Sequence, residues 1–192
     1  LNKEKDKKHD RIIFELSNNQ KLIYNDIRKF GFIKFTNRVN LKQNAHLKHL
    51  GPEPLSERFN IEYFKNYILG KERTIKDLLM DQKFLSGLGN IYVNEILFFS
   101  GVRPEKKINK LKNFEIQKII KFSKKIISKA IKLGGSSIKD FSSSSGKKGS
   151  FQQHFGVYGK KGKTCSSFKC IGKIKKIVIA NRASFFCDKC QK

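Results

Sequence analysis

Four cysteines near the end of the chain constrain its fold more than any other feature. Four residues separate Cys165 from Cys170, two separate Cys187 from Cys190, and about sixteen lie between the two pairs. Two short-spaced pairs that flank a hairpin-length segment are typical of a zinc ribbon, in which thiolates from two turns bind one metal ion tetrahedrally. We therefore predict one structural zinc ion, because four protein ligands leave no open position for catalysis. Four unligated thiols are the alternative.

The chain as a whole is strongly basic. It has 42 Lys and Arg against 16 Asp and Glu, which gives a formal net charge of +26 and favours a polyanionic partner such as nucleic acid. A general preference for lysine also explains part of this excess, because many lysines fall on solvated helix faces. The sequence has no apolar run of about 18 residues and no signal peptide, so we expect a cytoplasmic protein without membrane association.

Hydrophobic periodicity divides the chain into a β-rich start, a helical middle and a β-rich end. Alternating apolar residues predict an antiparallel meander of three strands at 11–16, 21–24 and 31–35, which can be the end of a larger sheet. After the two prolines of segment 50–54 the spacing becomes helical, and it predicts helices at 61–69, 75–79, 91–98 and 114–133. The composition of segment 134–150, rich in Gly, Ser and Lys, is typical of a linker.

Four motifs follow one another along the chain. They are DIRKFG from Asp26, DQKFLSGLGNIYVNEILFFSGVRP from Asp81, GGSSIKDF from Gly134 followed by GSFQQHFGVYG from Gly149, and the terminal NRASFFCDKCQK. In this order they resemble the formamidopyrimidine-DNA glycosylase family. The resemblance covers essentially the whole chain and implies an α+β fold with three parts. Residues 1–40 are then the final strands of an N-terminal β-sandwich catalytic domain, 41–150 a helix-two-turns-helix DNA-binding domain with a damaged-base loop at 134–150, and 151–192 a zinc finger built on the ribbon hairpin.

The resemblance also assigns residues that bind the DNA backbone. The turn at 87–90 precedes a helix, so its N–H groups and the Asn90 side chain can meet a phosphate, although ordinary helix capping explains such a turn as well. By resemblance, Asn90 and Arg182 bind the phosphates beside the damaged nucleotide, and Arg182 also takes part in the elimination step. Arg182 alone, at the tip of a hairpin, is typical of a solvated surface residue. His9, Lys71 and Lys76 match further DNA-contacting positions of the family.

Other matching positions concern the damaged base itself. An enzyme that acts on a base must flip it out of the duplex, and wedge and donor side chains then fill the gap. The resemblance implies that Phe30 is the wedge and that Arg28 pairs with the orphaned base, whereas a buried Phe30 is the alternative. It also replaces the linker interpretation of 134–150 by a loop that reads the flipped purine through its backbone, with the contacts at Ser136, Ser137, Ile138 and Lys139.

The implied function is base-excision repair of oxidised purines. The family removes 8-oxoguanine and formamidopyrimidines and then cuts the strand as an AP lyase, with zinc as its structural ion and double-stranded DNA that contains oxidised bases as its partner. We expect a monomer in the bacterial cytoplasm, associated with the nucleoid. The alternatives are an endonuclease VIII-type glycosylase for oxidised pyrimidines and a non-catalytic zinc-ribbon protein that binds nucleic acid.

The sequence departs from the family at two places. The first cysteine pair is separated by four residues where two are usual, which lengthens that turn. The family's nucleophile is the amine of an N-terminal proline, assisted by an adjacent glutamate and by a lysine, whereas residue 1 here is Leu and the prolines are Pro52, Pro54 and Pro104. We therefore expect the amino-terminal catalytic segment to be missing and the 192-residue chain to bind DNA without cutting it.

Overall fold

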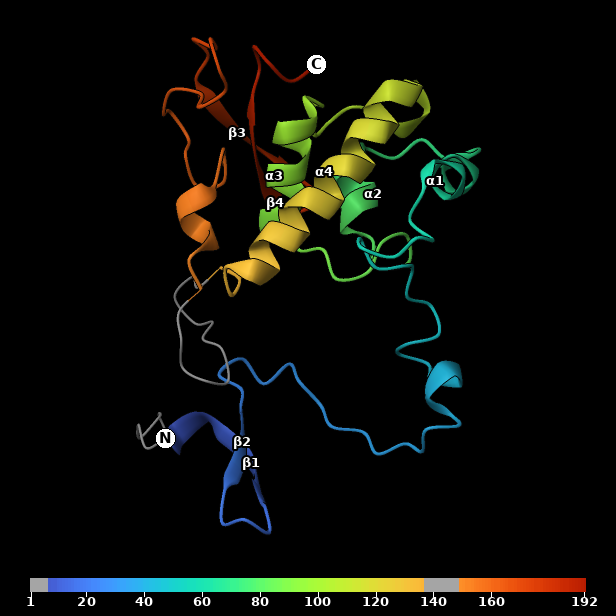
Figure 1. Ribbon diagram of the computed structural model, residues 1–192, viewed down its shortest axis with the longest axis vertical. Helices are drawn as coiled ribbons and strands as arrows, with labels where there is room; N and C mark the ends of the chain where they lie inside the picture. The colour runs from blue at the N-terminus through green and yellow to red at the C-terminus, as the bar shows by residue number, and fades with distance from the viewer. Residues whose placement is uncertain (1–6, 137–148) are drawn as a thin grey trace. The chain divides into compact units, whose positions relative to one another are not determined.

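The computed structural model describes residues 7–136 and 149–192, which belong to two compact units, Leu1–Asn44 and Ala45–Lys192 (Figure 1). Strands β1 and β2 lie in the first unit, whereas helices α1 to α4 and strands β3 and β4 lie in the second. The mixed α+β class expected from the sequence is confirmed. None of the helices in the described ranges combines the length and the apolar character needed to cross a membrane.

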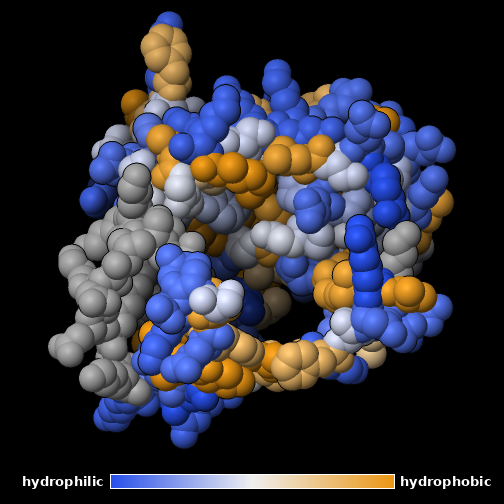
Figure 2. Space-filling model, turned by 60° about the horizontal axis from the view of Figure 1, so that its bottom comes forward, coloured by the Kyte–Doolittle hydropathy of each residue, from blue (hydrophilic) through white to orange (hydrophobic). Residues whose placement is uncertain are grey.

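The first unit is built around one antiparallel hairpin. Strand β1 (Asp10–Glu15) pairs with β2 (Lys21–Asn25), with Ile13 opposite Ile23. Asn19 takes a left-handed conformation in the connecting turn, with φ of 60°, which asparagine tolerates well. Two short 3-10 helices, Lys7–His9 and Leu41–Gln43, complete its regular structure. Apolar side chains stay open to solvent on both strands, and Figure 2 shows apolar patches on one face of the molecule.

The third strand predicted at 31–35 is wrong, because the described segment has no regular structure there. The Asp26 carboxylate accepts N–H bonds from Arg28, Lys29 and Gly31 at 3.0, 3.0 and 2.8 Å, and this closes a tight turn directly after β2. The segment after this turn pairs with neither strand of the hairpin. Phe32 and Phe35 remain 64% and 88% exposed, because alternation alone supplies no surface on which to pack.

The second unit begins with helices whose starts are set by local capping. Helix α1 (Ile61–Ile68) is capped by the Asn60 side chain, and α2 (Ile75–Met80) by Thr74. Helix α3 (Asn90–Ser100) begins after Gly89 and ends at Gly101, which adopts φ of 71°. Helix α4 (Asn113–Lys132) and two short 3-10 helices, Ile108–Lys110 and Phe151–His154, follow. The four predicted helices are thus confirmed, with ends that shift by one or two residues.

The core of the second unit lies between these helices and is rich in aromatic rings. Phe59, Phe64 and Phe84 are fully buried and meet edge to face or tilted, with ring centroids 5.0 to 6.4 Å apart. Helix α3 contributes Val93, Ile96 and further apolar residues and is buried on several sides. Because α3 occupies the centre of the packing, it holds a fixed position for the residues at its first turn.

The ribbon hairpin predicted between the cysteine pairs is confirmed. Strand β3 (Ile174–Ile179) pairs antiparallel with β4 (Arg182–Cys187) through a two-residue turn. Ala180 and Asn181 both have positive φ, 47° and 58°, the pattern of the turn whose twist matches a two-residue hairpin. Strand β4, whose first residue is Arg182, packs against α3 (Figure 1).

Candidate DNA-binding site and cysteine cluster

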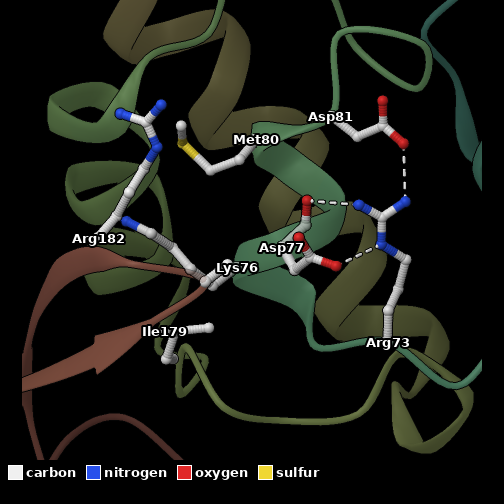
Figure 3. Close-up of a pocket in the computed structure, with 8 residues that line it drawn as sticks. Arg73, Lys76, Asp77, Met80, Asp81, Ile179 and Arg182 are labelled. Atoms are coloured by element: carbon white, nitrogen blue, oxygen red, sulfur yellow. Dashed lines mark hydrogen bonds and ion pairs between the residues drawn. The ribbon is translucent and has the colours of Figure 1, made fainter.

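Helix α2 and the β3–β4 turn enclose a cavity of about 330 Å³. Its walls come from Arg73, Lys76, Asp77, Met80, Asp81, Ile179, Ala180 and Arg182 (Figure 3). The figure shows Lys76 reaching from α2 toward the base of the Arg182 side chain, which extends along the same side of the cavity. Two of the residues expected to bind DNA, distant in sequence, are therefore neighbours.

Lys76 is the most unusual group of this site, because it is a buried amine. Its Nζ donates a hydrogen bond of 2.6 Å to Oδ1 of Asn90, and its side chain is 1% exposed. Burial, together with the smaller effect of the nearby positive charge of Arg182, lowers the pKa of Lys76 from 10.5 to about 7. An anion that enters the cavity favours the charged form of Lys76, since it supplies the missing counter-charge.

Asn90 joins the first turn of α3 to strand β4. Its Nδ2 donates to the Ala183 carbonyl oxygen at 3.0 Å, while its Oδ1 accepts from Lys76. Asn94, one turn later, donates to the Asn90 carbonyl oxygen at 2.7 Å and accepts from the Phe185 N–H at 2.7 Å. These bonds hold the start of α3 against the residues that follow Arg182. Sequence reasoning missed Asn94, although two asparagines four positions apart in an apolar helix were a usable signal.

The opposite wall of the cavity is an ion-paired cluster that sequence reasoning also missed. Arg73 donates from Nε to the Asp77 carboxylate at 2.8 Å and from Nη1 to the Asp81 carboxylate at 2.7 Å. Because two carboxylates face one guanidinium, this wall keeps one net negative charge, and its carboxylates pair with Arg73 rather than with Lys76 or Arg182. The spacing of Asp77 from Arg73, one helical turn, was the signal in the sequence.

The remaining candidate residues belong to other segments of the chain. Lys71 is not among the residues that line the cavity, and its Nζ donates to the Tyr67 carbonyl oxygen at 2.5 Å and lies 3.5 Å from the centre of the Tyr67 ring. His9 ends the first 3-10 helix of the first unit. Ser136 is half-buried and pairs with Ser150, whereas Ser137, Ile138 and Lys139 lie outside the described residues.

Arg28 and Phe30 lie together on the turn that follows β2. The Arg28 guanidinium is 4.6 Å from the centre of the Phe30 ring, and Phe30 is 77% exposed. The alternative of a buried Phe30 is therefore wrong. The three N–H bonds accepted by Asp26 fix the backbone of this turn, so that a large apolar ring and a cation project from an ordered loop.

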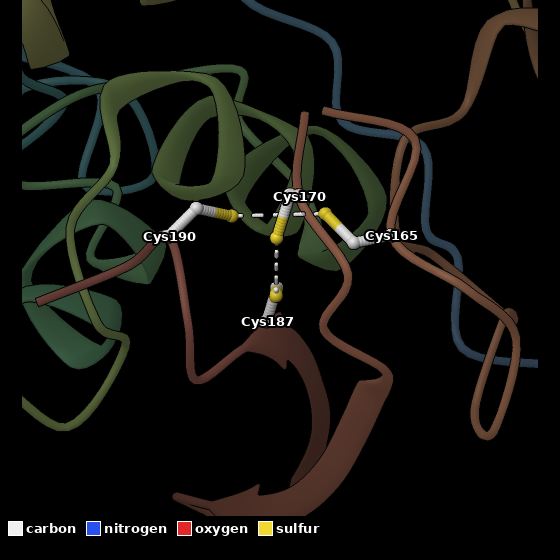
Figure 4. A group of neighbouring side chains, drawn as sticks. All are labelled: Cys165, Cys170, Cys187 and Cys190. Carbon is white, nitrogen blue, oxygen red and sulfur yellow. Dashed lines mark hydrogen bonds between the residues drawn. The ribbon is translucent and has the colours of Figure 1, made fainter. Parts of the chain in front are cut away.

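The four cysteines form one cluster at the far end of the ribbon hairpin (Figure 4). All four Sγ atoms lie within 4.8 Å of one another, and Cys165–Cys190 and Cys170–Cys187 are each 3.7 Å apart. A tetrahedral zinc ion with Zn–S bonds of about 2.3 Å requires sulfur atoms about 3.8 Å apart. The donor set and its spacing therefore fit a zinc ion held by these four thiolates.

The lengthened first turn of the cluster closes without displacing its thiols. The Cys165 N–H donates to the Gly172 carbonyl oxygen at 2.7 Å, and the Gly172 N–H points to Sγ of Cys170 at 3.4 Å. The inserted residues extend into solvent, where Phe168 is 88% exposed. Gly172 cannot be replaced without strain, because a Cβ there meets Sγ of Cys187 at 2.6 Å.

Two buried polar side chains attach the ribbon to the helical part of the same unit. The Glu95 carboxylate accepts N–H bonds from Gly156, Val157 and Tyr158 at 2.6, 3.1 and 2.8 Å. Gln191 accepts from the Cys187 N–H at 2.9 Å and donates to the Val102 carbonyl oxygen at 2.8 Å. Both were missed, since nothing local in the sequence indicates contacts across about 60 to 90 positions. Glu95, an acidic residue within the apolar run of α3, was the one sign in the sequence of a buried polar contact.

A capped helical module with Lys76 and Arg182 side by side in one cavity, joined to a four-cysteine hairpin, defines a class of DNA-binding proteins. Residues 50–142 match the family model of the formamidopyrimidine-DNA glycosylase H2TH domain. Formamidopyrimidine-DNA glycosylases from Rickettsia conorii and Roseobacter denitrificans are 40% and 38% identical to this chain over 187 and 189 residues. The chain belongs to the formamidopyrimidine-DNA glycosylase family.

These matches cover nearly all of this chain and about two thirds of each relative. Coverage is 97% of the chain and 67% of the Rickettsia protein, and 96% and 65% for the Roseobacter protein. The crystal structure of MutM (Fpg) from Thermus thermophilus is 32% identical with a TM-score of 0.89, and covers 97% of this chain and 70% of that one. Lactococcus lactis Fpg in complex with DNA that contains an abasic site is 37% identical with a TM-score of 0.89, at 98% and 68% coverage.

Proposed function

We propose that this chain grips duplex DNA for the excision of oxidised purines, with Lys76, Asn90 and Arg182 as the phosphate-binding groups. The observation that carries the proposal is that α2, α3 and β4 bring these three residues to one place. The N-cap of α3 is Gly89, which has no side chain to cap the first N–H groups, so these groups are available to an anion. Relatives solved with damaged DNA support the choice of partner.

Each group has a distinct task in this proposal. Arg182 presents a planar fork that binds two phosphate oxygens at once, and it also assists the elimination that cuts the strand. Lys76 supplies a buried positive charge once an anion is present. Asn90 orients the Lys76 amine through its Oδ1 and holds strand β4 through its Nδ2. His9 and Lys71 add further contacts to the DNA backbone.

The first unit and the loop at 134–150 handle the damaged base. Phe30 enters the base stack when the nucleotide flips, and Arg28 pairs with the base left opposite. The loop with Ser136 reads the flipped purine through its backbone. A zinc ion held by the four thiolates keeps the ribbon folded, so that Arg182 stays in place. The protein acts as a monomer in the bacterial cytoplasm, on the nucleoid.

Catalysis in the family's manner needs an amine of low pKa beside the sugar, and the residues described here offer none in that role. Lys76 is committed to Asn90 and the phosphate. We propose that glycosylase and AP-lyase activity require the family's amino-terminal proline and glutamate. A polypeptide of residues 1–192 then binds DNA and is not trapped on it by borohydride, whereas the same polypeptide preceded by a relative's amino-terminal segment is trapped.

Binding measurements with Arg182→Ala test the phosphate-gripping role. The variant should bind damaged and undamaged duplexes more weakly by the same factor, because a phosphate contact carries no sequence information. The slope of log affinity against log salt should fall by about one unit. Lys163→Gln, which removes an exposed charge outside the cavity, is the control. An unchanged slope for Arg182→Ala, or efficient borohydride trapping of residues 1–192, contradicts the proposal.

A further inference from the structure

A row of five lysines covers the outer face of α4. Glu115, Ile116, Ile119, Ser123, Ile126 and Ala130 are buried on one side of the helix. The opposite side carries the α4 lysine stripe, which consists of the exposed Lys118, Lys121, Lys125, Lys129 and Lys132. Their spacing of three or four positions places them in one line along the helix, and at about 1.5 Å per residue the line is about 21 Å long.

Nothing on α4 compensates these charges. Glu115 is the helix's acidic residue in the first turn, but it is buried and bound to Lys106 at 2.7 Å. None of the ion pairs found in the described ranges involves the stripe. Like charges three or four positions apart oppose helix formation. The helix is therefore kept in place by its buried face, and its outer face is an uncompensated positive surface.

The stripe and the cavity lie on different sides of α3. Asn90 and Asn94 of α3 bond to β4, next to Arg182. Another side of α3 contacts α4, where Phe99 of α3 stacks on Phe122 of α4 with ring centroids 6.0 Å apart. Figure 1 shows the same order in space, with α4 toward the viewer and the ribbon strands behind α3. One duplex held at Arg182 thus leaves the stripe open.

We propose that the α4 lysine stripe is a second binding surface for the phosphate backbone of duplex DNA. Lysines on flexible stems suit a row of phosphates, which they contact as point charges without reading bases. An anionic membrane fits less well, because membrane-bound helices insert an apolar face and the apolar face of α4 is buried in the core. With both surfaces occupied, the protein bridges two DNA segments. The inference rests on the proposed function, since it presupposes a first duplex at the cavity.

A stoichiometry measurement with the zinc-loaded 192-residue protein tests this inference. The stripe variant combines Lys118→Gln, Lys121→Gln, Lys125→Gln and Lys129→Gln, and glutamine keeps nearly the helix propensity of lysine. A charge-matched control combines Lys65→Gln, Lys110→Gln, Lys161→Gln and Lys163→Gln, all exposed and outside the stripe. Circular dichroism verifies that both variants fold. Binding of a short duplex is followed by titration and by capture of a second, labelled duplex on an immobilised one.

We expect the unmodified protein and the control to bind two duplexes and to capture the labelled one. The stripe variant should bind one, with second-site affinity at least about tenfold lower and first-site affinity within about twofold. A single duplex on the unmodified protein, equal loss in both variants, or binding of phosphatidylserine vesicles in place of a second duplex overturns the inference. Loss of the first site in Arg182→Ala, or the absence of a first site in the unmodified protein, concerns the proposed function. Either result is distinguishable from loss of the second site.

Discussion

The hairpins β1–β2 and β3–β4 have the same local design and differ in what covers them. Both are antiparallel pairs of short strands joined by a tight turn. Ile13 and Leu22 of the first are 51% and 59% exposed, whereas Ile174 and Phe186 of the second are 2% and 3% exposed. Helix α3 and the cysteine cluster supply the second hairpin with its partners. Strand pairing follows from local pattern and turn chemistry, whereas burial depends on surfaces contributed from elsewhere.

Removal of the metal should abolish the difference in burial between the two hairpins, and this loss is the largest effect that we expect. Without an ion, the four thiols no longer hold the two turns together, and the free energy of zinc binding in comparable units, about 10–16 kcal/mol, is lost from folding. Chelation should therefore unfold the ribbon and leave the signals of the first hairpin unchanged in a ¹H–¹⁵N spectrum.

Gly172→Ala should act in the same direction, because its Cβ meets Sγ of Cys187 at 2.6 Å. Gly159→Ala, at a position where a Cβ has open space, serves as a control for the loss of a glycine. Because Gly159 has a positive φ, Gly159→Ala adds backbone strain but no steric clash, and it therefore isolates the effect of the clash at Gly172. A ribbon that stays folded in chelator, with no zinc measured, contradicts the structural role of the metal.

A matched pair of isoleucine truncations measures the burial of each hairpin directly. Ile174→Ala deletes a buried side chain of β3 and should lower the free energy of unfolding by about 2–5 kcal/mol. Ile13→Ala deletes an exposed one of β1 and should cost less than about 1 kcal/mol, through strand propensity alone. Urea denaturation of the zinc-loaded protein gives both values. Equal losses from the two variants mean that the first hairpin is buried as well as the second.

The distinction between local pattern and contacts with distant parts of the chain also explains how much of the fold could be predicted from the sequence. Helices α1 to α4 and the ribbon were predictable, because capping residues, apolar periodicity and cysteine spacing are local signals. The strand at 31–35 failed for the opposite reason. Its alternation was local, but a strand needs a partner, and this segment pairs with neither β1 nor β2.

The candidate site was predictable only in part. Resemblance supplied Asn90 and Arg182, whereas their connection through Lys76 and Asn94 joins positions up to 91 residues apart. No spacing rule encodes such contacts. The buried state of Lys76 in particular follows from packing between α2, α3 and β4, and a lysine on an amphipathic helix is ordinarily taken for a solvated residue.

DNA binding should depend on pH through the buried Lys76 and not through the exposed Arg28 beside the first hairpin. The free-state pKa of Lys76 is about 7, and a bound phosphate raises it, so binding above that pH takes up a proton. Affinity should be constant below about pH 7 and fall above it, by at most about tenfold per pH unit. Fluorescence anisotropy from pH 6 to 9 measures this dependence. Lys76→Met should flatten the profile while Arg28→Ala retains it, and a sloping profile in Lys76→Met assigns the proton to another group.

The smallest expected effect concerns the two hairpin turns. Here the exposed hairpin has the residue better suited to its backbone conformation, and the buried hairpin has the less suited one. The exposed hairpin has Asn19 in its left-handed position, but the buried hairpin has Ala180 at φ of 47°. Left-handed backbone costs alanine about 1–2 kcal/mol, and glycine avoids this at the expense of about 0.5–1 kcal/mol of additional chain entropy. Ala180→Gly should therefore stabilise the protein by roughly 0.5 kcal/mol or slightly more. Ala183→Gly, three positions along in regular strand β4, should destabilise it by a similar amount. Thermal unfolding of both zinc-loaded variants gives the sign of each change. A loss of stability in Ala180→Gly means that the left-handed backbone of Ala180 is not strained.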